Sequence, residues 1–291
     1  MTKIVVAGDG RRLAVEEWGA PDGAAVFLMH GTPGSRFGPR PRESVLWRLG
    51  VRLFAYDRPG YGESDRLGAR VVAHAAEDVA VIADAFGLER FAVLGRSGGG
   101  PHALACASLL ADRVRCAAVL VGLAPRDAAG LDWYDGMTPR NVSAYQTAET
   151  WVGALVARFE AQAALMRRDP VAHLPYRDRE LSASDQRVIS DSGIRTMMAS
   201  NFAEAVKRSG GGWVDDAVSF ITAWGFDPAG IAVPVLLWHG AQDVHAPVRH
   251  TLWLAERIPR SHLVIAHDEA HFGALSAVPG ALSWLVDRHR A

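Results

Sequence analysis

The amino-acid sequence predicts an α/β fold, in which helices flank a mostly parallel β-sheet and a helical segment interrupts the alternation. Short runs rich in Val, Leu, Ile and Phe alternate with longer stretches of helical periodicity over residues 1–124 and again over 229–291. This alternation is typical of a parallel sheet covered by helices. Residues 125–228 instead carry a helical pattern broken by Gly and Pro, without strand signals. We therefore expect one α/β core domain, 1–124 and 229–291, with a helical insertion at 125–228.

The predicted strands begin with an antiparallel hairpin. Residues 4–6 and 13–18 flank a turn at Gly8, Asp9 and Gly10, and glycine-rich turns of this kind close hairpins. The later strands are short, apolar and bounded by turn residues, and they cover 25–29, 52–56, 91–94, 116–121, 233–239 and 262–265.

The predicted helices lie between these strands. In the first of them, residues 72–86, Val79, Ile82 and Phe86 recur at helical spacing and Gly87 provides a stop. A helix of small residues follows, and two more close the chain, covering 98–111, 248–258 and 275–290.

The composition is that of a globular protein and excludes several other classes. Hydrophobic residues make up 49% of the 291 positions and charged residues 22%, which excludes disordered and coiled-coil chains. With 31 basic and 32 acidic residues the formal net charge is −1, so we expect no binding to nucleic acid or to an anionic membrane. No apolar run approaches the ~18 residues that span a bilayer, and no secretory signal is evident.

These features lead us to expect a cytoplasmic protein. Cys106 and Cys116 are too few for a disulfide framework in a chain of this length, so we predict two reduced core thiols. Arginine and alanine are abundant and lysine is scarce, a composition that points to a bacterial genome rich in GC.

A serine nucleophile is predicted at Ser97. Residues 95–99 match G-x-S-x-G, and they lie where a β-type run ends and a helix begins. Such a strand–turn–helix junction forces the serine into a sharp, exposed turn, and glycine on either side lets the turn pack closely. Ser64 stands in a similar run that lacks the second glycine and a preceding strand, so we expect a loop residue there.

A serine hydroxyl needs a base, and the base needs an acid to orient it. In this class of junction the acid and then the histidine follow the serine along the chain. Asp243 and His271 lie in the loops that follow the last two predicted strands, and such strand ends meet at one edge of a parallel sheet. We predict these two residues for the roles, with Asp127 and His267 as the alternatives.

A metal site is the rival use of the histidines. His267 and His271 have an i, i+4 spacing, but the residues between them do not give H-E-x-x-H and no third ligand stands out. We therefore predict neither a metal nor another cofactor. His245 and His250 lack a matching acid and nucleophile, so we expect them at the surface or in packing.

Acyl transfer also needs hydrogen-bond donors for the oxyanion. The residue after the nucleophile, Gly98, supplies one from its backbone. The second is expected in the loop after residues 25–29, where Pro33 has no N–H and Thr32 is the natural donor.

Five runs of the sequence resemble, in chain order, the signatures of the α/β-hydrolase fold superfamily. They are HGTPG at 30–34, DRPGYGES at 57–64, GRSGG at 95–99, GAQD at 240–243 and AHF at 270–272. The resemblance implies an eight-stranded sheet and a helical cap at 125–228, as in capped esterases, lipases and aminopeptidases. Epoxide-opening and dehalogenating members are less similar, because they carry an aspartate where Ser97 stands.

The expected function is hydrolysis of a medium-sized, mainly apolar ester, thioester or lactone through an acyl-enzyme on Ser97, in a monomer or homodimer. We expect the small-molecule substrate to contact His30, Gly31, Arg96, Trp133, Met137 and Phe272. The same triad also serves C–C bond hydrolysis, acyl transfer, amide or peptide cleavage and cofactor-free lyase reactions, and a binding protein of this fold that does not turn over its ligand stays an alternative.

Overall fold

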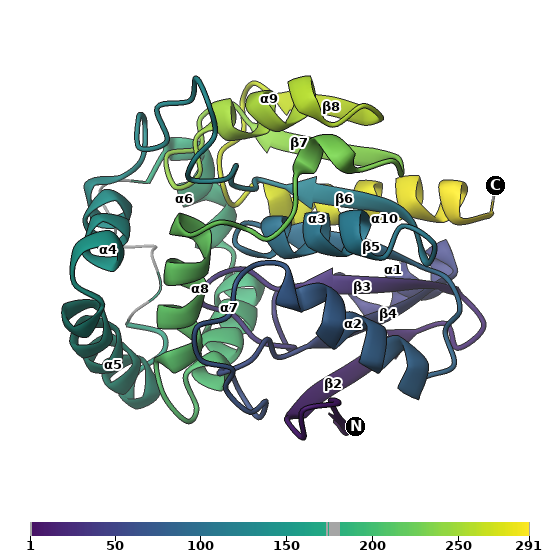
Figure 1. Ribbon diagram of the computed structural model, residues 1–291, viewed down its shortest axis with the longest axis horizontal. Coiled ribbons are helices and arrows are strands. Elements are labelled where there is room, and N and C mark those ends of the chain that lie inside the picture. Colours follow the sequence, from purple (N-terminus) through teal and green to yellow (C-terminus); the bar gives the residue numbers. More distant parts are fainter. Residues whose placement is uncertain (1, 173, 175–180, 291) are drawn as a thin grey trace.

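The computed structural model describes residues 2–172, 174 and 181–290, and its centre is one eight-stranded sheet (Figure 1). The spatial order of the strands is β1-β2-β4-β3-β5-β6-β7-β8. The strands are β1 (Lys3–Val6), β2 (Arg12–Gly19), β3 (Ala24–Met29), β4 (Val51–Tyr56), β5 (Phe91–Arg96), β6 (Val114–Leu120), β7 (Val235–Gly240) and β8 (Ser261–Ala266). Each predicted strand is found, with its ends within two residues of the prediction.

The sheet is mostly parallel, as the alternation of strands and helices predicts. β1 pairs antiparallel with β2, and β2 antiparallel with β4. All the other neighbours are parallel. The parallel strands place their carboxyl ends at one edge of the sheet, where the loops after β3, β5, β7 and β8 meet.

Helices cover both faces of the sheet, because the central strands are buried on both sides. In β3, Val26 and Leu28 pack into one apolar cluster and Phe27 and Met29 into the other, which is the two-residue alternation of a strand. α2 (His74–Ala85), α3 (Gly99–Leu109) and α9 (Val248–Arg257) cover the face of Phe27, and α1 (Glu43–Leu49) and α10 (Ala274–Arg290) cover the other.

Helix α1 is absent from the sequence prediction. Leu46 is the one buried residue among its seven positions, and so short a stretch carries little of the periodicity that marks a helix. Arg42 at its N-cap makes no capping hydrogen bond with its side chain, which removes the second usual helix signal.

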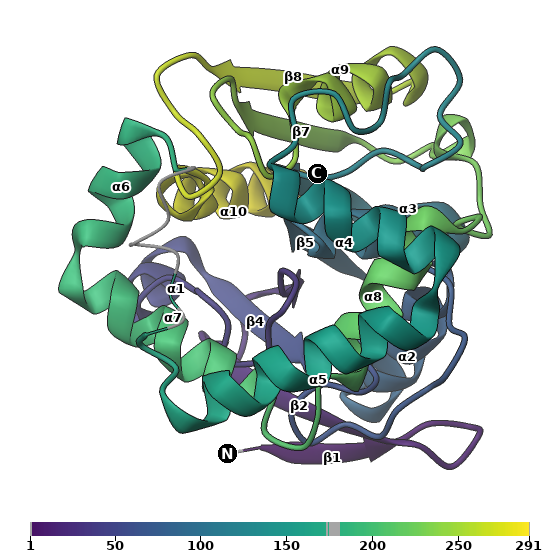
Figure 2. The same ribbon diagram turned by 90° about the vertical axis from the view of Figure 1, so that its left-hand side faces the viewer.

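Between β6 and β7 the described part of the chain forms a helical segment, which we call the insertion. Its described helices are α4 (Pro139–Thr150), α5 (Val152–Arg168), α6 (Ala183–Ser190), α7 (Ser192–Ala205), α8 (Gly211–Ile221) and the short η2 (Pro228–Gly230). Helices α4 to α8 lie beyond the edge of the sheet at which the parallel strands end (Figures 1 and 2), whereas η2 packs near α3 and α9.

The start of α8 packs closely against the core. A Cβ atom at Gly212 would lie 2.7 Å from the Tyr61 ring, and one at Gly210 would lie 2.8 Å from the carbonyl oxygen of Phe159. These glycines therefore bring the helix backbone into contact with its neighbours.

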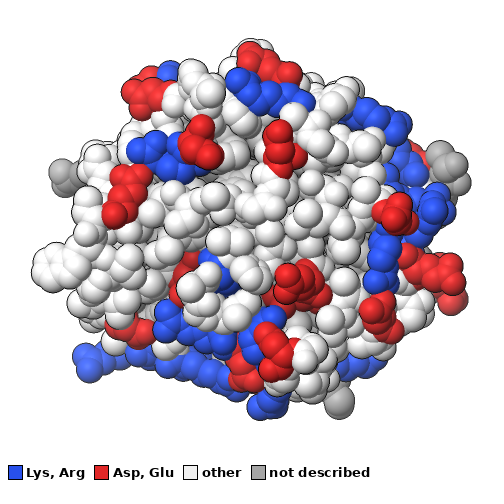
Figure 3. Space-filling model, viewed as in Figure 1, with Lys and Arg blue, Asp and Glu red and all other residues white. Residues whose placement is uncertain are grey.

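The surface shown in Figure 3 carries charges of both signs, and the two cysteines are buried. Basic and acidic side chains lie beside one another around the face shown in Figure 3, and none of the described helices is long and apolar enough to cross a membrane. Cys106 and Cys116 are buried free thiols, and burial raises the pKa of Cys116 to about 12.

Candidate active site

Ser97 lies in a sharp turn between β5 and α3. Its backbone φ is +54°, a left-handed conformation that a non-glycine residue adopts at a cost. The turn is possible because glycine surrounds it: a Cβ at Gly95 would lie 2.3 Å from the Gly99 carbonyl oxygen, and one at Gly99 would lie 2.2 Å from that of Met29. The predicted close packing of these two glycines is therefore present.

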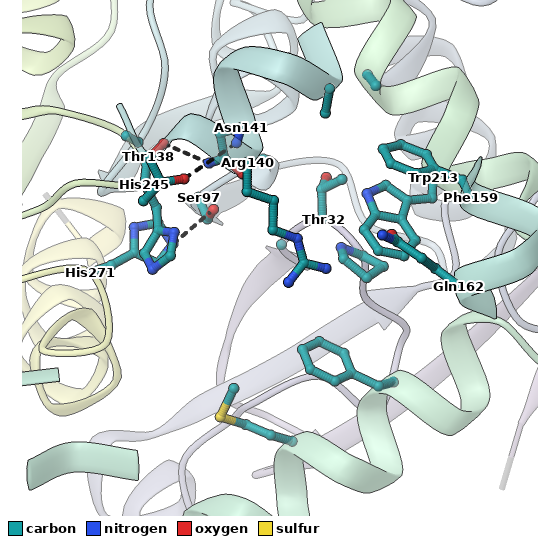
Figure 4. A pocket seen from close by; sticks show the side chains of 18 of the residues that line it. Thr32, Ser97, Thr138, Arg140, Asn141, Phe159, Gln162, Trp213, His245 and His271 are labelled. Atoms are coloured by element: carbon teal, nitrogen blue, oxygen red, sulfur yellow. Dashed lines mark hydrogen bonds between the residues drawn. The ribbon is translucent and has the colours of Figure 1, made fainter. Parts of the chain in front are cut away.

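Asp243 and His271 form a continuous hydrogen-bonded chain with Ser97. His271 Nδ1 lies 2.7 Å from Asp243 Oδ2, and His271 Nε2 lies 3.0 Å from Ser97 Oγ (Figure 4). Because a carboxylate oxygen can only accept, Nδ1 carries the proton and Nε2 is free to accept from the serine hydroxyl. The loops after β7 and β8 thus bring both predicted residues to the predicted nucleophile.

The surroundings of Asp243 hold its carboxylate in the ionised form. Oδ1 accepts hydrogen bonds from the backbone N–H groups of His245 (2.8 Å) and Ala246 (3.0 Å). His239 Nε2 lies 3.3 Å from Oδ2. Burial alone would raise the pKa of Asp243, but the charge of His271 and the hydrogen bonds from both histidines outweigh it and hold that pKa well below its ordinary range.

Thr32 and Gly98 lie against each other beside Ser97. A Cβ at Gly98 would lie 2.2 Å from Thr32 Oγ1, so only glycine fits there. Both residues line the same cavity as Ser97. Neighbouring parallel strands cause this proximity, since Met29 at the end of β3 pairs with Gly95 in β5.

A buried carboxylate from the insertion holds the Thr32 loop. Asp216 of α8 accepts from Thr32 Oγ1 (2.5 Å), Arg58 Nη2 (2.5 Å), Arg70 Nη2 (2.6 Å) and Tyr61 Oη (2.8 Å). Burial alone would raise the pKa of Asp216, but the two guanidinium groups hold it well below its ordinary value. The network ties the insertion to the core next to the candidate oxyanion donor.

The site opens into a cavity of about 600 Å³ between the sheet edge and the insertion. Much of its wall is apolar, formed by Leu123, Phe159, Leu165, Met166, Trp213 and Phe220. Phe159 and Trp213 stack with ring centroids 4.3 Å apart, and Figure 4 shows them on the wall facing Ser97 and His271. This volume fits a small-molecule ligand.

Three of the six residues predicted to contact substrate line the cavity: Gly31, Arg96 and Phe272. The other three are buried elsewhere. His30 Nδ1 donates to the Gly31 carbonyl and Nε2 accepts from the Arg58 N–H. This histidine therefore fixes the loop behind the site.

Trp133 and Met137 also lie outside the described lining of the cavity. Both are buried in the large apolar cluster of the core. Trp133 Nε1 donates to the Ala124 carbonyl at 2.8 Å, and its ring packs edge-on against His250. Their apolar surface is used in packing, and contact of these two with substrate stays a prediction.

The alternatives weighed in the sequence take other places. Ser64 is buried and its hydroxyl accepts from the Ala14 N–H at 2.9 Å, which is the expected loop role. Asp127 and His267 are exposed. His250 is buried and bonds backbone groups of Ala124 and Trp133, a packing role as expected.

His245 differs from the expectation. It lines the cavity, and its ring centroid lies 5.1 Å from that of His271. The sequence feature that could have placed His245 at the cavity is its position two residues after Asp243. His239 and Asp185 were also missed: Asp185, in α6, accepts from the Phe272 N–H at 2.6 Å and so holds the backbone next to His271.

Among the residues that the structure describes, no three His, Cys, Asp or Glu side chains group as ligands for a metal ion. His271 is instead engaged by Asp243 and Ser97.

Known proteins with similar sequences indicate the family of this fold. A model of the alpha/beta hydrolase fold matches residues 24–277. The 2-hydroxymuconate semialdehyde hydrolase of Pseudomonas putida is 28% identical over 260 residues, which cover 86% of this chain and 82% of that enzyme. The non-heme haloperoxidase of Rhodococcus erythropolis is 34% identical over 124 residues, which cover 42% of this chain and 44% of that protein, less than half of its length.

Solved structures share the fold over the whole chain. The enol-lactonase from Burkholderia xenovorans LB400 aligns with a TM-score of 0.72 and 20% identity, covering 99% of this chain and 100% of that one. The esterase from Exiguobacterium antarcticum aligns with a TM-score of 0.71 and 19% identity, covering 100% of both chains. The family model, which spans most of the sequence, and these shared architectures lead to one conclusion: the chain belongs to the alpha/beta hydrolase fold family.

Proposed function

We propose that the protein is a serine hydrolase that cleaves a carboxylic ester, thioester or lactone through an acyl-enzyme on Ser97. The observation that supports this most strongly is the unbroken hydrogen-bonded chain from Asp243 through His271 to Ser97, which ends at the wall of a cavity. Nucleophile, base and orienting acid in this order are the arrangement that acyl transfer requires.

In the proposed first step, Ser97 Oγ attacks the carbonyl carbon of the substrate and His271 Nε2 takes the hydroxyl proton. The carbonyl π electrons move to the oxygen, which becomes an oxyanion. As the carbonyl re-forms, the bond to the leaving group breaks and His271 returns the proton to that group. Water then attacks the acyl-enzyme with His271 again as base, which releases the acid and restores Ser97.

The backbone N–H groups of Thr32 and Gly98 are the proposed oxyanion donors. Among the described residues, neither amide has a hydrogen-bond acceptor, so both are available to a ligand. Each such donor is worth about 10²- to 10³-fold in rate in acyl-transfer enzymes.

Residues 125–228 are proposed as a cap domain over a core formed by 1–124 and 229–291. Side chains of α4, α5 and α8 supply much of the cavity wall opposite Ser97. Because many of these side chains are apolar, a medium-sized and largely apolar acyl or alcohol group fits the space.

A second candidate is hydrolysis of a carbon–carbon bond beside a carbonyl by the same residues. The similarity to a 2-hydroxymuconate semialdehyde hydrolase over most of both chains favours testing carbonyl substrates that are not esters. Parallel assays with an ester, a thioester and a 1,3-diketone separate the two candidates.

Steady-state hydrolysis of p-nitrophenyl butyrate tests the proposal. Ser97→Ala removes the nucleophile, and we expect kcat to fall by about 10³-fold or more, since triad residues act as a unit. Ser64→Ala is the matched control: Ser64 bonds a backbone amide away from the cavity, so its loss should leave kcat within about threefold while costing ~1 kcal/mol of stability. A Ser97→Ala variant that keeps a tenth of the wild-type kcat contradicts the proposal.

A further inference from the structure

The lining of the cavity, as far as the structure describes it, contains arginines and no acidic side chain. The arginines are Arg96, Arg140 and Arg158. Arg96 directly precedes Ser97, whereas the other two come from α4 and α5.

Other arginines in the interior form ion pairs with carboxylates. Arg36 forms an ion pair with Asp57, and Arg58 and Arg70 share Asp216. This is the usual requirement, because a buried cation without a partner is costly. The three cavity arginines have no carboxylate partner among the described residues, and Arg140 is exposed, so its guanidinium is open to an anionic ligand.

Arg140 is the best placed to meet a ligand. It is the second residue of α4, and its side chain extends from the helix into the cavity (Figure 4). Its guanidinium lies between the side that carries Ser97 and His271 and the wall that carries Trp213. Within the described part of the chain, no hydrogen bond or ion pair engages this guanidinium.

The surroundings of the other two arginines disfavour their charged forms. Burial and the charge of Arg140 lower the pKa of Arg158. Burial lowers the pKa of Arg96 to about 10, with no carboxylate acting against it. In each case the surroundings disfavour the charged form, so an anion in the cavity would stabilise both residues.

We propose that the substrate carries a carboxylate group, which Arg140 binds while Ser97 attacks a carbonyl at the other end of the molecule. This inference rests on the proposed function and names its substrate class. A guanidinium offers two parallel N–H groups to the two oxygens of a carboxylate. The rings of Phe159 and Trp213 beside it favour an apolar chain between the carboxylate and the reacting carbonyl.

Two matched esters test the inference. p-Nitrophenyl hydrogen adipate carries a terminal carboxylate, and p-nitrophenyl 6-methylheptanoate replaces its two oxygens with methyl groups. With enzyme-free hydrolysis subtracted, we expect the wild-type protein to prefer the adipate ester in kcat/KM by about tenfold or more, as charge-assisted hydrogen bonds allow. Raising the salt concentration should reduce this preference, because a partly exposed ion pair is screened.

Arg140→Gln should abolish the preference while leaving kcat/KM for the neutral ester within about threefold, and Arg140→Lys, which keeps the charge but loses the fork, should restore part of it. Arg126→Gln is the matched control. Arg126 belongs to the same insertion but pairs with Glu149 and does not line the cavity, so the preference should persist.

The outcomes separate the inference from the function on which it rests. Equal hydrolysis of both esters, or a preference that survives Arg140→Gln, overturns the carboxylate inference and leaves the serine hydrolase standing. Hydrolysis of neither ester counts against the proposed ester hydrolysis. Calorimetric binding of adipate then decides the inference: binding that Arg140→Gln removes supports it, and the absence of binding overturns it.

Discussion

Asp243 combines two roles at the scale of single residues. One carboxylate oxygen accepts two backbone N–H groups of its own loop, and the other orients His271. The first interaction fixes the loop and the second fixes the imidazole in the form with the proton on Nδ1. A residue that merely carried charge near the histidine would not give this orientation.

Asp243→Asn tests this description. The amide keeps the shape of the side chain but can donate to Nδ1 and so favours the wrong tautomer, and we expect kcat for a neutral ester to fall by about 10³- to 10⁴-fold. Asp127→Asn, at the exposed alternative acid, should leave kcat unchanged. An Asp243→Asn variant with near wild-type kcat would remove Asp243 from the catalytic account.

Asp243→Asn should also change how the free energy of unfolding depends on pH. The folded-state pKa of Asp243 lies below its ordinary value of 3.8, so the carboxylate stabilises the fold above pH 3.8 and loses this contribution as the pH falls toward the folded-state pKa. The difference in unfolding free energy between wild type and Asp243→Asn should therefore be largest near neutral pH and shrink in acid.

The proposed nucleophile, base and acid could be found in the sequence because each stands in a short local pattern. Ser97 lies between glycines at a strand end, and Asp243 and His271 follow later strand ends. His245 and His239 could not be assigned in this way. Their contacts depend on how the loop after β7 folds back on itself, which no periodicity records.

At the scale of elements, α8 ties the insertion to the core. Asp216 lies at its centre and is shared by Arg58, Arg70, Tyr61 and Thr32. The helix therefore both closes the cavity and fixes the loop of Thr32. This coupling makes the geometry of the proposed oxyanion donor depend on the docking of the insertion.

Asp216→Asn should destabilise the protein by about 3–5 kcal/mol, because Arg58 and Arg70 lose their buried counter-charge. Unfolding in urea, followed by tryptophan fluorescence, measures the change. Asp215→Asn is the matched control on the same helix. Its partner Arg66 is half exposed, so its loss should cost no more than ~1 kcal/mol. Equal losses from the two variants would contradict the role given to Asp216.

Elements with a repeated pattern were predicted better than isolated ones. Helical spacing predicts α2, and short apolar runs predict the parallel strands. Helix α1 buries only Leu46 and lacks a capping side chain, so neither signal marks it. Gly210 and Gly212 lie at the start of α8. In the structure they are contact points, because the distances that explain them run to Tyr61 and Phe159, far away in the sequence.

At the scale of the whole molecule, the cavity exists only where the insertion meets the edge of the sheet. The sequence shows that an insertion is present but not which of its faces turns inward. For this reason Trp133 and Met137 were expected to contact substrate and are instead buried in packing. Arg140 and Arg158 belong to no apolar pattern or motif that would predict a place in the cavity wall, and only the folded structure shows them there.

The most direct test of the central claim is covalent labelling of the folded wild-type protein with a fluorophosphonate, followed by mass spectrometry of its peptides. The account predicts one phosphonylated residue, Ser97, with labelling lost in Ser97→Ala and strongly slowed in His271→Ala. Labelling at another residue, or no labelling of folded protein, would contradict it.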